Sequence, residues 1–145
     1  MKQLRFLLII LIPLLLSEKN TSELVVIVNS DNTTKPLTPS EVKLIYLRKI
    51  TRRWSGINKN IVPVDRKDSP EIKELFLNTI LGMSDDELDR YYTERGYQNE
   101  ELPPVTLASD AEVIGFVSKN IGAIGYVSSS SLNKDNSVKI KIVYP

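Results

Sequence analysis

The residues with the clearest chemical potential follow the apolar segment Ile61–Val64. A charged loop, Asp65–Asp68, leads from this segment into Ser69, which begins a predicted helix. Backbone N–H groups and the dipole at the start of a helix favour an anion, and a guanidinium adds bidentate hydrogen bonds. We therefore predict Arg66 and Ser69 as the contacts of a phosphate, a sulfate or a carboxylate.

The same segment also has a purely structural interpretation. Ser69 can cap its helix while Arg66 pairs at the surface with Asp65 or Asp68. Pro70 favours this interpretation, because a proline lacks one of the N–H donors that an anion would use. The residues alone leave both roles open.

A basic cluster lies nearer the N-terminus, where five cations precede the only tryptophan, Trp54. These cations are Lys43, Arg48, Lys49, Arg52 and Arg53. Such a cluster suits nucleic acid, with Trp54 as a stacking platform, but cations also complement the C-terminal end of a helix. Without residues 1–17 the chain has 17 basic and 18 acidic side chains, so its overall charge does not attract nucleic acid. We expect the structural role and no nucleic-acid partner.

The inventory for catalysis and metal binding is small. Cysteine and histidine are absent, which removes thiolates, the commonest general base and the commonest neutral metal ligand. The acidic stretch Asp85–Asp89 lacks the glycine pattern of a calcium loop, and its carboxylates complement the dipole of a predicted helix. Serines, alone or with a lysine, remain as nucleophiles, but no Gly-x-Ser-x-Gly motif accompanies them. We predict no enzyme, no metal and no cofactor.

The first 17 residues predict a secretory signal peptide. Lys2 and Arg5 precede an apolar run of eleven residues, Phe6–Leu16, and the small residue Ser17 suits a cleavage site. A membrane-spanning helix needs about 20 apolar residues, although an uncleaved signal anchor stays open as the alternative. The remaining residues, 18–145, are long enough for one domain, which we expect in the periplasm.

Helix and strand signals alternate along this domain. Three capping boxes, beginning at Thr38, Ser84 and Ser109, predict helix starts, and Ser69-Pro70 predicts a fourth. The predicted strands are 24–28, 61–64, 105–107, 122–127 and 138–142. This order, β-α-β-α-α-β-α-β-β, predicts an α/β fold in which helices flank a mixed sheet.

Three segments resemble successive blocks of the periplasmic phosphate-binding proteins of ABC transporters. They are Leu44–Trp54, Ile61–Arg66 and the most specific one, Gly122-Ala123-Ile124-Gly125-Tyr126-Val127. The resemblance implies a single lobe of a type II periplasmic-binding-protein-like fold, because members of that family have two lobes and are about twice as long. The chain therefore looks like a short, single-domain relative.

The phosphate-binding loop of that family is only partly matched. Arg66, Asp68 and Ser69 fit its Arg-x-Asp-Gly-Ser-Gly-Thr pattern, whereas Pro70 and Glu71 stand where the pattern has glycine and threonine. Arg48 likewise replaces a glycine that ends the preceding helix.

Two functions follow as expectations. The first is a solute-binding protein for phosphate or a similar oxyanion, serving an ABC transporter or a sensor and forming a homodimer, because one lobe cannot enclose a small ion. The alternative is an envelope protein-interaction module that keeps the lobe without binding a ligand. The first requires Arg66 to be free in a cleft, and the second requires an exposed apolar patch.

Overall fold

The computed structural model describes residues 22–50, 52–67, 70–99 and 103–145. The predicted signal peptide, residues 1–17, lies outside these ranges, and so does Ser69. The proposed division at residue 17 therefore stays a prediction. Within the described ranges, no helix is both long enough and apolar enough to cross a membrane.

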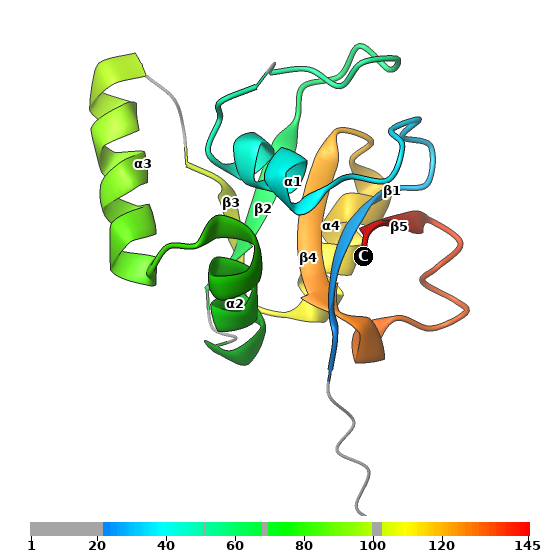
Figure 1. Ribbon diagram of the computed structural model, residues 1–145. Coiled ribbons are helices and arrows are strands. Elements are labelled where there is room, and N and C mark those ends of the chain that lie inside the picture. Colours follow the sequence, from blue (N-terminus) through cyan, green and yellow to red (C-terminus); the bar gives the residue numbers. More distant parts are fainter. Residues whose placement is uncertain (1–21, 51, 68–69, 100–102) are drawn as a thin grey trace, which may run out of the picture.

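The order of the helices and strands confirms the α/β prediction (Figure 1). The elements are β1 (Leu24–Asn29), α1 (Pro39–Tyr46), β2 (Val62–Arg66), α2 (Pro70–Phe76), α3 (Asp85–Asn99), β3 (Val105–Leu107), α4 (Asp110–Lys119), β4 (Ala123–Ser128) and β5 (Ile140–Tyr144). A short π-helical segment, Leu77–Leu81, continues α2, and a 3₁₀ turn, Ser129–Ser131, follows β4.

The five strands form one mixed sheet in the order β3-β2-β4-β1-β5. Strand β2 runs parallel to β3 and to β4, whereas β1 runs antiparallel to β4 and β5. The carboxyl ends of β2, β3 and β4 therefore share one edge of the sheet, at the bottom of Figure 1.

Helices cover both faces of this sheet. On one face, α1 and α2 with its π-helical extension form a buried cluster with Leu24, Val26 and Val28 of β1, to which α3 contributes Leu88. On the other face, α4 packs on Val25 and Ile27. All six residues of β1 are buried, as its continuous apolar run predicts for a strand covered on both sides.

The helix starts agree closely with the sequence. Thr38 and Ser84 each form a complete capping box, with Glu41 and Glu87 respectively. The Ser109 box is half formed: its hydroxyl accepts from the Glu112 N–H at 3.1 Å, but the Glu112 carboxylate accepts from the N–H of Ala108. The α2 segment ends at Gly82, whose φ of 62° suits a residue without Cβ.

Two local expectations need refinement. Pro63 predicts an edge strand or a strand end, and β2 lies inside the sheet; pairing with β3 begins only at Val64, so Pro63 occupies the strand end. The last strand lies two residues later than expected, because Val138 belongs to a turn and is 73% exposed.

Candidate functional site

The shared carboxyl edge of the sheet gathers polar groups from three strands. Strand β2 ends at Arg66, β4 ends at Ser128, and β3 leads through Ala108 and Ser109 into the start of α4. In open α/β sheets, ligands bind at the carboxyl ends of the strands. We name the group formed by Arg66, Asp110, Ser128 and Ser131 the carboxyl-end site.

Arg66 is buried at this edge, with 3% of the residue exposed. Its Nη1 donates to Oδ1 of Asp110, and its Nη2 donates to the carbonyl of Ala108 at 3.4 Å. Its Nε is also buried and finds no hydrogen-bond acceptor among the described residues. The partner of Arg66 is thus Asp110, 44 residues further along the chain, and not the neighbouring Asp65 that the structural interpretation proposes. The requirement of a free Arg66 is not met either.

Asp110 uses both of its carboxylate oxygens. Oδ1 accepts from Arg66, while Oδ2 accepts from the N–H of Ser128 at 3.1 Å and from the hydroxyl of Ser131 at 2.5 Å. A guanidinium, a backbone N–H and a hydroxyl from three parts of the chain therefore converge on one carboxylate. This is the donor set that an oxyanion requires.

A second charged group lies beside the site. Asp65 accepts hydrogen bonds from the Tyr126 hydroxyl and from the N–H of Arg66, and Lys73 bridges Asp65 at 3.3 Å and Asp85 at 2.8 Å. Burial acts to lower the pKa of Lys73, but the hydrogen bond and charge of Asp85, together with Asp65, outweigh it and raise that pKa. Asp65 is therefore engaged with groups other than the Arg66 guanidinium.

The other predicted anion contact is Ser69. Ser69 and Asp68 lie outside the described residues, so the role of Ser69 as an anion contact stays a prediction. Among the described residues, no three Asp or Glu side chains are grouped closely enough to hold a metal ion.

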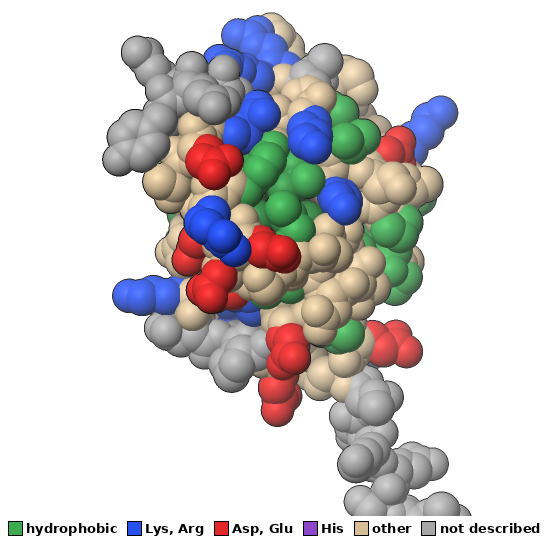
Figure 2. Space-filling model, turned by 60° about the vertical axis from the view of Figure 1, so that its left-hand side comes forward, with side chains coloured by type: hydrophobic (Ala, Val, Ile, Leu, Met, Phe, Trp, Pro, Cys, Tyr) green, Lys and Arg blue, Asp and Glu red, His purple; other side chains and the backbone are tan. Residues whose placement is uncertain are grey.

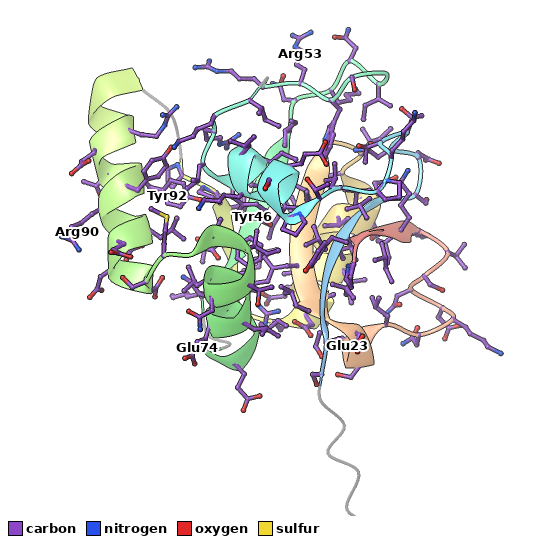
Figure 3. The ribbon with its side chains drawn as sticks, viewed as in Figure 1. Glu23, Tyr46, Arg53, Glu74, Arg90 and Tyr92 are labelled. Atoms are coloured by element: carbon purple, nitrogen blue, oxygen red, sulfur yellow. The ribbon has the colours of Figure 1, made fainter. Side chains whose placement is uncertain are left out.

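The basic cluster belongs to another part of the molecule. Trp54 is 6% exposed and donates from Nε1 to the carbonyl of Gly122 at 2.9 Å, so it packs in the core and offers no stacking surface. Arg48 adopts the left-handed conformation, with φ of 55°, at the position where the resemblance expects glycine. Arg53 lies at the end of the molecule opposite to Glu23 and Glu74, which lie near the carboxyl edge (Figure 3).

Sequence reasoning missed Asp110, Ser128 and Ser131 as members of the site. In the sequence, Asp110 is one of several acidic residues that follow a predicted helix start. Ser128 and Ser131 belong to a run of four serines, which predicts a polar loop. The usable signal is that the Ser109-x-x-Glu112 pattern already predicts a cap for α4, which leaves the Asp110 carboxylate without a predicted capping role.

Comparison with known proteins finds similarity at the level of solved structures. No family model and no curated protein matches the chain. A protein of Clostridium perfringens, assigned as a phosphate ABC transporter substrate-binding protein and solved with bound phosphate, matches with a TM-score of 0.64 and 25% identity. The match covers 84% of this chain and 44% of that protein.

Two further solved structures match the chain to a similar extent. An ABC-type phosphate transport receptor of Vibrio cholerae matches with a TM-score of 0.62 and 23% identity, over 84% of this chain and 45% of the receptor. PstS of Borrelia burgdorferi matches with a TM-score of 0.58 and 20% identity, over 85% and 47%. These neighbours are solute-binding proteins and not enzymes. The chain thus spans less than half of their length and has the fold of a partial phosphate-binding protein of ABC transporters, the class that its sequence resembles.

Proposed function

We propose that the protein is an exported solute-binding-like module that binds phosphate or a similar oxyanion at the carboxyl-end site. The observation that carries this proposal is the convergence of the Arg66 guanidinium, the Ser128 N–H and the Ser131 hydroxyl on a single acidic group. A phosphate oxygen accepts hydrogen bonds from the same donors as a carboxylate oxygen does. The bound phosphate named for the Clostridium perfringens neighbour supports this choice of ligand.

The proposed partner is an ABC transporter or a sensor in the envelope. This follows from the transport role named for the neighbours and is supported by residues 1–17, whose pattern is typical of a signal for export. The described donors of the carboxyl-end site come from one edge of one sheet, so they reach an ion from one side. We therefore propose weak binding by the monomer and a homodimer in which a second copy covers the ion.

Calorimetric titration of the purified protein with phosphate tests the proposal. We expect saturable heat that weakens when Ser131→Ala removes one donor and disappears in Arg66→Ala, with circular dichroism confirming that each variant is folded. Ser137→Ala is the matched control, because the Ser137 hydroxyl donates to the carbonyl of Lys134 in the neighbouring turn and contacts no residue of the carboxyl-end site. Absence of heat up to millimolar phosphate from the folded wild-type protein would rule out phosphate as the ligand.

One observation favours the alternative of a protein-interaction module. Hydrophobic side chains gather on the face that α3 presents, bordered by charges of both signs (Figure 2). A groove between α1 and α3 contains Met83 and Tyr91, flanked by Lys43 and Arg90 and by the acids Glu87 and Glu94. This alternative predicts no phosphate heat, and an envelope partner whose capture is lost in Arg90→Glu and kept in Ser131→Ala.

A further inference from the structure

The Asp110 carboxylate has an environment unlike that of the other helix-start acids. Asp85, in the first turn of α3, is 57% exposed and pairs with Lys73, which also contacts Asp65. Asp110, in the first turn of α4, is 18% exposed and carries three hydrogen bonds from outside its own helix. Its helix is capped by Ser109 instead. The position of Asp110 is therefore determined by the strand ends and not by helix capping.

Arg66 depends on Asp110 for its charge balance. The guanidinium is almost fully buried, and a buried cation needs an anionic partner. The other nearby acid, Asp65, bonds to the N–H of Arg66, to the Tyr126 hydroxyl and to Lys73. Asp110 is thus the one described carboxylate that contacts the guanidinium of Arg66.

An added oxyanion would compete with Asp110 for the same donors. Two anions on one buried guanidinium repel each other, so the carboxylate and the ligand cannot both occupy the donor set. A tetrahedral oxyanion also offers more acceptor oxygens than a carboxylate does, and Nε of Arg66 has no acceptor among the described residues. The partial exposure of Asp110 gives its side chain a route to solvent.

We propose that Asp110 is an internal counter-anion that occupies the carboxyl-end site and is displaced when an oxyanion binds. This inference rests on the proposed function, since it describes how the same site is regulated. Asp110 keeps Arg66 neutralised in the free protein, and it sets a threshold concentration below which the external anion does not enter. The residue thereby acts as a positioning and affinity-setting group, not as a ligand contact.

Asp110→Asn tests this assignment, because it removes the competing charge with little change of shape. We expect phosphate and sulfate each to bind about tenfold or more tightly to the variant than to the wild-type protein, measured by calorimetry. The variant should also lose thermal stability in anion-free buffer and regain it as phosphate is added, because the external anion replaces the lost partner of Arg66. A merely structural aspartate would lose stability without this recovery.

Asp85→Asn is the matched control, since it removes another helix-start acid that is ion-paired. Its phosphate affinity should equal that of the wild-type protein, and phosphate should raise its melting temperature by no more than it raises that of the wild-type protein. If Asp110→Asn fails to fold, the double variant Arg66→Met, Asp110→Leu removes both charges, and we expect it to fold with no response to phosphate.

The outcomes separate the two proposals. Phosphate binding by the wild-type protein that is equal or weaker in Asp110→Asn overturns the counter-anion assignment and leaves the proposed function standing. Binding by the variant alone supports the assignment and identifies the wild-type site as blocked by its own carboxylate, which favours the interaction module. Absence of binding by both folded proteins overturns both proposals.

Discussion

The Tyr126 hydroxyl donates a hydrogen bond of 2.5 Å to Oδ1 of Asp65, which joins strands β4 and β2 one residue before Arg66. The same oxygen accepts from the N–H of Arg66 at 2.8 Å. The Tyr126 ring stacks on Phe76 of α2, with ring centroids 3.9 Å apart. Contacts from β4 and α2 therefore hold the backbone at Arg66 in place.

Removing this hydroxyl should weaken the fold. We expect Tyr126→Phe to lower the free energy of unfolding by about 1–3 kcal/mol, because the buried carboxylate of Asp65 loses a donor. Urea denaturation measures the change. Tyr144→Phe is the control: the Tyr144 hydroxyl makes no hydrogen bond to a described residue, so its substitution should stay within about 0.5 kcal/mol. Equal effects of the two substitutions would contradict the role assigned to the Asp65 contact.

The stability of the protein should fall in alkaline solution. Burial, and then the charge of Asp65, raise the pKa of Tyr126 above its ordinary value of 10.0. The unfolded chain therefore loses this proton at a lower pH than the folded protein does, so the contribution of Tyr126 is complete below about pH 10 and is lost as the pH rises further. Burial likewise raises the pKa of Tyr46 above its ordinary value.

Urea denaturation of the wild-type protein and Tyr126→Phe across about pH 9 to 11 measures this effect. The difference in unfolding free energy between the two proteins should shrink as the pH rises, because phenylalanine does not ionise. A difference that stays constant over this range would show that the Tyr126 hydroxyl titrates alike in the folded and unfolded states.

Alanine substitutions at two glycines, one within α4 and one in the neighbouring strand β4, should change the free energy of unfolding in opposite directions. A Cβ at Gly125 of β4 would lie 2.6 Å from Cγ1 of Val113, so Gly125→Ala should cost about 1–3 kcal/mol. A Cβ at Gly115, within α4, meets no atom within 4 Å, so Gly115→Ala should stabilise the helix by about 0.5–1 kcal/mol.

Thermal or urea unfolding shows whether each variant is more or less stable than the wild-type protein. Adding Val113→Ala to Gly125→Ala should recover part of the loss, because the two residues are in contact and their effects are not additive. Purely additive losses would show that α4 does not approach β4 as closely as described.

The single tryptophan provides a test that needs no substitution. Because Trp54 is buried and bonded to the carbonyl of Gly122, acrylamide should quench its fluorescence weakly in the native protein and strongly after unfolding. Added phosphate should leave this quenching unchanged, since the basic cluster lies away from the carboxyl edge. Strong quenching in the native state would instead show that Trp54 is exposed to solvent, as a stacking platform requires.

Much of the architecture could be predicted from local signals. The capping residues Thr38 and Ser84 determined where α1 and α3 begin, since a side-chain oxygen and a glutamate three residues later satisfy N–H groups that the helix leaves unpaired. The uninterrupted apolar run of β1 predicted burial on both faces. A glycine inside a strand, such as Gly125, is typical of a close approach by a neighbouring element, and Val113 of α4 makes that approach.

The site itself depended on contacts between distant parts of the chain. The sequence singled out Arg66, whose role as an anion contact stays a prediction, but it did not point to its partner Asp110 or to the donors Ser128 and Ser131. These residues meet only because β2 pairs in parallel with both β3 and β4, which brings three carboxyl ends together.

The sequence by itself therefore determined the helices, the strands and their order, because caps, apolar runs and glycines act over a few residues. The strand order, the interior position of β2 and the pairing of Arg66 with Asp110 were decided by the tertiary structure. The physical reason is that a buried guanidinium takes whichever carboxylate the packed sheet places beside it, and proximity along the chain does not decide that choice.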